Sequence, residues 1–258
     1  MSVRVVVSGA AGRMGQETCR AVASDPALEL VGAVDVVQSG RSLADLVGGG
    51  VPGLPMRGDL VAVVRDTQAQ VVVDFSVPES RMKVFSAAIA AGARPVVGTT
   101  GWTEADIAAC RTLCQRHGLG AIIAPNFSIG AVLMMKFAAQ AARYMPSVEI
   151  IELHHNQKLD APSGTAVKTA ALIAAARGDR EPGEPHPARG QEFHGVPIHS
   201  VRLPGLLAHQ QVIFGGLGQT LTLVHDSLSR ESFMPGVILA CKRVLELNEL
   251  VYGLENLL

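Results

Sequence analysis

The sequence contains no run of lysines or arginines, and charge of either sign is scarce. Its 22 basic and 23 acidic residues give a formal net charge of −1, and charged residues make up only 17% of the chain. Proteins that bind nucleic acids need clustered cations to neutralise phosphates. We therefore do not expect nucleic acid as a partner.

Long hydrophobic runs are also missing. The most apolar helical stretch, residues 129–145, contains Lys136 and Arg143, whereas a membrane-spanning helix needs about 20 mostly apolar residues. The first residues, MSVRVVVSGAAG, lead directly into a short strand and a glycine turn and lack the pattern of a signal peptide. These absences predict a cytoplasmic protein that does not act in a membrane.

Cysteine is sparse as well. The four cysteines, Cys19, Cys110, Cys114 and Cys241, form no CxxC pair and have no histidine at zinc-finger spacing. We expect no metal site. Cys110 and Cys114 lie four residues apart in a predicted helix, where two buried thiols are favoured over a redox pair.

The first half of the chain alternates short β-branched runs with helical stretches. This alternation predicts βαβ units and an α/β fold, with a Rossmann-like, doubly wound parallel sheet covered on both faces. The expected strands are residues 4–8, 29–35, 71–75, 95–98 and 120–124, and the expected helices are residues 14–23, 79–91 and 104–116.

The pattern changes after residue 126. It predicts a long helix over 129–145, a strand ending at the double histidine, a helix over 163–176, a surface loop over 178–197, and strands within 198–203, 209–216 and 219–228. We expect a dinucleotide-binding domain over 1–126. A smaller α+β domain over 127–233, with an open mixed sheet, would bind substrate and support oligomerisation. The last segment, 234–258, would pack back on the first domain.

A glycine turn follows the first predicted strand and precedes a helix. It reads Gly9-Ala10-Ala11-Gly12-Arg13-Met14-Gly15, with the spacing G-x-x-G-x-x-G instead of G-x-G-x-x-G. Such a turn lets the backbone approach a pyrophosphate, which the helix N-terminus stabilises. The alternative is a glycine turn without a ligand.

Asp35 favours the nucleotide interpretation. It ends the second predicted strand, twenty residues after Gly15, where a carboxylate accepts hydrogen bonds from the adenosine ribose. A carboxylate there repels a 2′-phosphate, and Val36 follows it in place of an arginine, so the sequence favours NADH over NADPH. Arg13 and Arg41 remain available to a phosphate.

Two further segments follow predicted strands, at the sheet edge where open α/β sheets bind ligands. The first is Gly98-Thr99-Thr100, and the second is Ala124-Pro125-Asn126-Phe127. Their small and hydrogen-bonding residues are candidates for contact with the nicotinamide end of a dinucleotide.

The segment HHNQKLDAPSGT, residues 154–165, combines proton-carrying and anion-binding groups. His154 and His155 point opposite ways in a strand and would not chelate one metal. Lys158 lies in a loop from which its amine can return to the same site. Ser163 is a natural N-cap, and Gly164 and Thr165 would offer N–H groups to an anion. Each feature alone also fits a purely structural role, but the set favours a dicarboxylate or keto-acid site.

These motifs resemble, in order, those of the 4-hydroxy-tetrahydrodipicolinate reductase (dihydrodipicolinate reductase) family. GAAGRMG, VVVDFS, VVGTTG, APNFSIG and ELHHNQKLDAPSGTA carry the resemblance, which covers nearly the whole chain. It implies a two-domain subunit, usually a homotetramer, that reduces a cyclic imine dicarboxylate with NADH or NADPH in lysine and diaminopimelate biosynthesis.

The resemblance also implies roles for individual residues. His154 would donate and accept a proton, Lys158 would donate one, and His155, Gly164 and Thr165 would contact substrate. Gly9 to Met14, Asp35, Gly98 to Thr100 and Ala124 to Phe127 would hold the cofactor. Two residues depart from the usual pattern: Val36 replaces an arginine, and Gln157 replaces a histidine or basic residue before Lys158.

Two other functions fit parts of the sequence. One is a different two-domain NAD(P) oxidoreductase, such as an amino-acid or semialdehyde dehydrogenase, which a catalytic cysteine in a loop would support. The other is a nucleotide-sensing protein without catalysis, which cofactor binding without turnover would support.

Overall fold

The computed structural model describes residues 2–178 and 188–258. The chain divides into two compact units: a first unit of Met1–Phe127 with Phe233–Leu258, and a second unit of Ser128–Ser232. The boundaries expected from the sequence lie one residue away from these. The roles expected for the two parts remain predictions.

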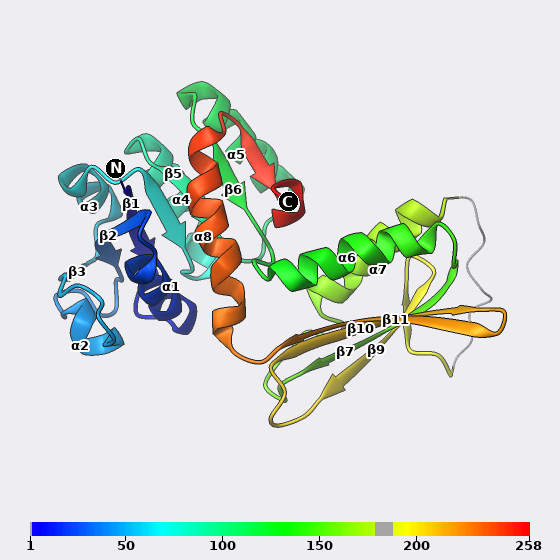
Figure 1. Ribbon diagram of the computed structural model, residues 1–258. Coiled ribbons are helices and arrows are strands. Elements are labelled where there is room, and N and C mark those ends of the chain that lie inside the picture. Colours follow the sequence, from blue (N-terminus) through cyan, green and yellow to red (C-terminus); the bar gives the residue numbers. More distant parts are fainter. Residues whose placement is uncertain (1, 179–187) are drawn as a thin grey trace. The chain divides into compact units, whose positions relative to one another are not determined.

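The first unit contains a seven-stranded sheet in the order β12-β6-β5-β4-β1-β2-β3 (Figure 1). All its pairings are parallel. The strands are β1 (Val3–Ser8), β2 (Leu28–Val34), β3 (Met56–Arg57), β4 (Val71–Asp74), β5 (Arg94–Val97), β6 (Ala121–Ile123) and β12 (Leu250–Tyr252). This architecture confirms the predicted Rossmann-like α/β sheet.

Helices cover both faces of this sheet, because valine-rich strands expose apolar side chains on each side. They are α1 (Arg13–Ser24), α3 (Leu60–Thr67), α4 (Arg81–Ala90), α5 (Glu104–His117) and α8 (Met234–Arg243). The short helix α2 (Leu43–Val47) contacts α1. α8 contacts α1, β1 and β5, while α3, α4 and α5 contact one another in series. Val5, Val6 and Val7 of β1 are all fully buried, so neither face is open there.

The C-terminal segment returns to this unit, as the sequence suggested for a final helix. It also supplies β12, an edge strand that the sequence did not predict. β12 pairs in parallel with β6, and Arg111 donates a hydrogen bond to the Leu250 carbonyl (3.1 Å). Only three residues long, this strand shows no alternation that could separate it from a loop.

The second unit contains a five-stranded sheet in the order β11-β10-β7-β9-β8. Its strands are β7 (Ser147–His154), β8 (Gln191–Phe193), β9 (Val196–Arg202), β10 (Ala208–Gly216) and β11 (Gln219–Ser227), and its helices are α6 (Ile129–Ala142) and α7 (Gly164–Arg177). β7 and β9 are parallel and the other pairs antiparallel, which makes the sheet mixed. Both helices pack on one sheet face around Val148, Ile150 and Phe214.

The predicted loop over 178–197 is wrong at its end. Residues 179–187 lie outside the described part, but 191–193 form β8, and β9 begins at Val196. His194 (φ +51°) and Gly195 (φ +71°) both adopt left-handed backbone between the two strands. Two such residues make the tight turn that favours a β-hairpin, so β8 extends the sheet where composition alone indicated a surface loop. Among the described residues, no helix combines the length and apolar character needed to span a bilayer.

Candidate functional site

The glycine turn joins β1 to α1 in the first unit. Gly9 adopts a left-handed backbone (φ +73°), and its N–H donates to the Val34 carbonyl (2.9 Å). A Cβ on Gly15 would lie 2.0 Å from the Gly9 carbonyl oxygen, so only glycine permits the helix to approach the turn this closely. Gly12 is the N-cap of α1 and brings no side-chain cap. The backbone therefore offers N–H groups at a helix N-terminus, as a pyrophosphate requires.

Asp35 lies directly after β2 and faces this turn. Its carboxylate accepts hydrogen bonds from the backbone N–H groups of Ala11 (3.2 Å), Val37 (3.0 Å) and Gln38 (3.2 Å). These amides fix the carboxylate at the strand end, where a ribose would donate its hydroxyls. Arg41, a candidate for a phosphate, instead donates to the Gln38 side chain (3.0 Å).

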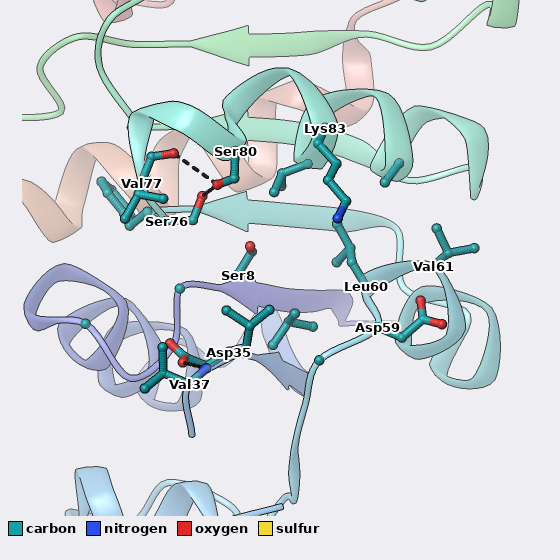
Figure 2. Close-up of a pocket in the computed structure, with 18 residues that line it drawn as sticks. Ser8, Asp35, Val37, Asp59, Leu60, Val61, Ser76, Val77, Ser80 and Lys83 are labelled. Atoms are coloured by element: carbon teal, nitrogen blue, oxygen red, sulfur yellow. Dashed lines mark hydrogen bonds between the residues drawn. The ribbon is translucent and has the colours of Figure 1, made fainter. Parts of the chain in front are cut away.

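A cavity of about 600 Å³ opens beside the turn and Asp35 (Figure 2). Three of the predicted cofactor residues line it: Gly9, Gly12 and Asp35. Ala10, Ala11, Arg13 and Met14 belong to the same turn but are not in its lining. The size suits part of a dinucleotide, and the glycine turn and carboxylate fit the group.

Most of the cavity wall consists of residues that the sequence motifs did not indicate. Residues before and within α3 form one side, and residues after β4 and in α4 form the other: Gly58, Asp59, Leu60, Val61, Phe75, Ser76, Val77, Ser80, Lys83, Val84 and Ala87. Ser76 and Ser80 share a hydrogen bond (2.9 Å), and Figure 2 shows Lys83 extending from α4 toward Leu60. The motif VVVDFS marked where β4 ends, and that was the available signal for this wall.

Asp74, at the end of β4, organises the neighbouring loops. It is 0% exposed and accepts hydrogen bonds from the Ser76 N–H (3.1 Å) and the Thr99 hydroxyl (3.0 Å). Burial raises the pKa of Asp74, although hydrogen bonds from Ser76, Thr99 and Ser8 oppose this effect. Thr99, a predicted cofactor residue, is therefore engaged through its side chain in the fold itself.

The other predicted segments of the first unit meet around Phe75. A Cβ on Gly98 would lie 2.1 Å from the Phe75 ring, and Phe127 packs edge-on against the same ring at 5.8 Å between centroids. The structure thus brings the loops after β4, β5 and β6 together. Thr100 and Pro125 are exposed at these loops, whereas Ala124 is buried.

In the second unit, His154 ends β7 and pairs with Glu152. Residues two apart in a strand lie on the same face, and His154 Nδ1 lies 2.5 Å from Glu152 Oε2. Glu152 is 0% exposed, on the face that also carries Val148 and Ile150. Sequence reasoning missed Glu152, although its spacing from His154 was the signal.

Arg202 completes this cluster from the neighbouring strand. The parallel register places Arg202 opposite His154, and its two terminal nitrogens donate to both Glu152 oxygens (2.9 and 2.7 Å). Burial alone would raise the pKa of Glu152, but hydrogen bonds from His154, Arg202 and Ser200 outweigh it and lower the pKa to about 2. No local sequence signal predicted Arg202.

Lys158 lies in a turn in which its N–H donates to the His155 carbonyl (3.1 Å). Its ammonium group contacts both carboxylate oxygens of Asp160 (2.7 and 2.9 Å), and its side chain is 21% exposed. Burial would raise the pKa of Asp160, but the hydrogen bond from Lys158 lowers it. Lys158 is thus paired with a carboxylate of its own loop, and its return to the site of the histidines stays a prediction.

The helix α7 begins as predicted. The Ser163 hydroxyl accepts a hydrogen bond from the Ala166 N–H (3.2 Å), which identifies Ser163 as the N-cap. Gly164 is exposed, and nothing lies within 4 Å of the position a Cβ would take. An anion can thus approach the amide end of this 14-residue helix.

All four cysteines are buried and free. Burial raises the pKa of Cys19, Cys110 and Cys241 to about 12, and that of Cys114 to about 11. A nucleophilic cysteine needs a lowered pKa and access to substrate. The structure therefore gives no support to thiol catalysis.

Two family models together match almost the whole chain. Residues 3–127 match "Dihydrodipicolinate reductase, N-terminus", and residues 130–258 match "Dihydrodipicolinate reductase, C-terminus". Two curated relatives are named 4-hydroxy-tetrahydrodipicolinate reductase. The one from Desulfitobacterium hafniense (strain DSM 10664 / DCB-2) is 51% identical and covers 99% of this chain and 98% of its own length. The one from Geobacillus thermodenitrificans (strain NG80-2) is 50% identical and covers both chains fully.

Solved structures agree with these matches. A dipicolinate-bound dihydrodipicolinate reductase from Paenisporosarcina sp. TG-14 has a TM-score of 0.87, 46% identity and full coverage of both chains. An amine dehydrogenase from Mycobacterium smegmatis has a TM-score of 0.68 over 96% of this chain and 93% of its own. At 13% identity, the second likeness concerns the fold alone.

Proposed function

The chain belongs to the dihydrodipicolinate reductase family, and on that premise we propose that it reduces 4-hydroxy-tetrahydrodipicolinate to tetrahydrodipicolinate with loss of water. This reaction serves lysine and diaminopimelate biosynthesis. The observation that carries the conclusion is the full-length match: relatives named for this enzyme share about half of all residues across both units. The chain is accordingly an oxidoreductase.

The first unit is the cofactor-binding part. Its Rossmann-like sheet and family match support use of NADH or NADPH, which would supply the hydride when bound. We assign cofactor contacts to Gly9 through Met14, Asp35, Gly98 through Thr100 and Ala124 through Phe127. Asp35 and the uncharged Val36 after it disfavour a 2′-phosphate, so NADH is the preferred form.

The second unit supplies the protons. Hydride addition to a conjugated imine builds electron density that a proton must quench, and a positioned acid accelerates such a step about 10² to 10⁴-fold. His154 donates and accepts a proton at this step, and Lys158 donates one. Both belong to the loop and strand end that Glu152, Arg202 and Asp160 hold in place.

The carboxylates of the substrate bind at the start of α7. Helix N–H groups and the helix dipole favour anions there, and the open space at Gly164 gives room for one. His155, Gly164 and Thr165 make these contacts. The active form is a homotetramer in the cytoplasm, and its partner is a small dicarboxylate.

The test is oxidation of NADH and of NADPH by the purified protein, with the unstable substrate generated in place from pyruvate and aspartate semialdehyde. Oxidation that requires the condensation product supports the reductase, and the ratio of the two rates measures the preference for NADH. A protein that binds either cofactor but oxidises neither would be a sensor or another dehydrogenase.

Lys158→Ala tests the assigned proton donor. We expect kcat to fall about 10² to 10⁴-fold, while the Kd for NADH, measured by fluorescence, stays within about twofold, below 0.5 kcal/mol. Lys242→Ala is the matched control, because Lys242 also pairs with an aspartate, Asp25 (2.8 Å), in the first unit. Equal kcat values for the two variants would remove Lys158 from the reaction.

A further inference from the structure

Glu152 introduces a charge into an otherwise apolar strand face. It follows Val148 and Ile150 on the side of β7 that the helices cover, and its side chain is fully buried. A buried carboxylate is costly unless it is paired and hydrogen-bonded. The residues around Glu152 must therefore compensate its charge with hydrogen bonds and a counter-ion.

Four nitrogen atoms surround the two oxygens of this carboxylate, and the Ser200 hydroxyl also bonds it. His154 Nδ1 (2.5 Å) and an Arg202 nitrogen (2.9 Å) approach Oε2. The other Arg202 nitrogen (2.7 Å) and the Ser163 backbone N–H (3.2 Å) approach Oε1. Neither the guanidinium nor the backbone amide can accept a proton, and together they donate to both oxygens, so this environment favours the ionised form of Glu152.

An ionised carboxylate can only accept hydrogen bonds, and this decides which ring nitrogen of His154 carries the proton. Nδ1 must carry the proton that it shares with Glu152, which leaves Nε2 as the nitrogen that can take up or release a proton. Within residues 2–178 and 188–258, no hydrogen bond engages Nε2.

Glu152 and Arg202 also contact the other parts of the 154–165 segment. Arg202 also donates to the Asp160 carbonyl (2.8 Å), and the Asp160 carboxylate holds the Lys158 ammonium group. Through Ser163, Glu152 also touches the N-cap of α7. The ion pair between the buried Glu152 and the partly buried Arg202 thus connects the three parts of the segment to which the proposed function assigns proton transfer and anion binding.

We propose that Glu152 is a positioning residue for the reduction, which holds His154 in the Nδ1–H tautomer so that Nε2 exchanges the proton, and that Arg202 fixes Glu152 in this role. The proposal rests on the proposed function for the step that His154 serves. The tautomer itself does not depend on that function.

The first measurement uses the wild-type protein alone, without substrate. ¹⁵N-histidine labelling distinguishes protonated from unprotonated ring nitrogens, and the missing signals of His154→Asn assign the residue. At about pH 9, well above the ordinary histidine pKa of about 6.5, we expect the proton of His154 on Nδ1. A proton on Nε2 would overturn the proposal, even if no variant of Glu152 folds.

The second measurement uses Glu152→Gln, which keeps the shape but places an NH₂ group among donors. With the amide N–H toward Nδ1, the proton of His154 should move to Nε2, and kcat should fall about 10² to 10⁴-fold while KM changes less. Wild-type kcat, or an unchanged tautomer, would overturn the proposal.

Glu149→Gln is the matched control. Glu149 lies on the same strand and also contacts a histidine and an arginine, His199 (2.7 Å) and Arg189 (2.7 Å), outside the 154–165 segment. The kcat of Glu149→Gln should stay at the wild-type value, measured on protein that forms an oligomer of the same size as wild type. If the wild type shows no substrate-dependent oxidation, the proposed function fails, whereas the tautomer result still decides the role of Glu152.

Discussion

Asp74 in the first unit and Glu152 in the second are both completely buried carboxylates, but their surroundings differ in kind. Asp74 accepts from a backbone N–H and from hydroxyl groups. Hydroxyls can also accept a hydrogen bond, so they tolerate a protonated partner. Glu152 also has a hydroxyl partner, Ser200, but it additionally faces a charged guanidinium, a backbone amide and an imidazole nitrogen. The pKa of Asp74 is raised by burial, whereas that of Glu152 is lowered to about 2.

This contrast matches what each region has to do. In the proposed function, the first unit would bind the cofactor through backbone N–H groups of the glycine turn, while Asp74 accepts hydrogen bonds from the neighbouring loops. In the proposed function, the second unit would act through side chains, and the charge of Glu152 would set the tautomer of His154. The two buried acids therefore differ in the direction of the pKa shift: burial prevails at Asp74, whereas the hydrogen bonds from His154 and Arg202 prevail at Glu152.

The largest difference should appear when each acid becomes an amide. Glu152→Gln should lower the free energy of unfolding by about 3 kcal/mol, because it leaves the partly buried guanidinium of Arg202 without its counter-ion. Asp74→Asn should cost less than about 1 kcal/mol at neutral pH, since its hydroxyl partners can turn to accept. Urea denaturation of both variants beside the wild type measures the two values. Equal losses would break the comparison.

Acidification should change the two differences in unfolding free energy, between wild type and each amide variant, in opposite directions. Glu152 has a folded-state pKa below its unfolded value, so its stabilisation exists above about 4.5 and is lost as the pH falls toward about 2. This change is on the order of 3 kcal/mol. Asp74 has a raised folded-state pKa, so its contribution is present at low pH and is lost as the pH rises through that pKa.

Denaturation curves at several pH values test this directly. On acidification, the difference in unfolding free energy between wild type and Glu152→Gln should shrink. Over the same range, the unfolding free energy of wild type should rise relative to that of Asp74→Asn. Parallel curves for wild type and Glu152→Gln would mean that Glu152 is not an anion in the folded protein.

The same contrast explains how far the sequence could be interpreted without a structure. Glycine spacing, the Ser163 N-cap and the strand end at His154 depend on neighbours in sequence, and local patterns predicted them. The contact of Arg202 with Glu152 joins residues 50 positions apart through the parallel β7–β9 register. Local periodicity carries no information on register, so the sequence could not show this pair.

The short edge strands were not predicted from the sequence, for a related reason. β3 has two residues and β12 three, too few for a period of two to be visible. Part of the cavity wall comes from the segments at Leu60 and Lys83, and its position depends on how α3 and α4 pack. Packing between helices is decided by the whole unit and not by either segment.

The smallest effect concerns charge at the rim of the first unit, where side chains are free to change. Val36 is 78% exposed beside Asp35 and lines the cavity. Val36→Arg should favour NADPH over NADH by about fivefold in kcat/KM, or about 1 kcal/mol for an exposed ion pair with the 2′-phosphate. This preference for NADPH should weaken with added salt, because exposed charges are screened.

Val77→Arg adds the same charge to the cavity from the β4 side and is the matched control. If both variants shift the ratio equally, overall charge in the cavity and not the position beside Asp35 selects the cofactor.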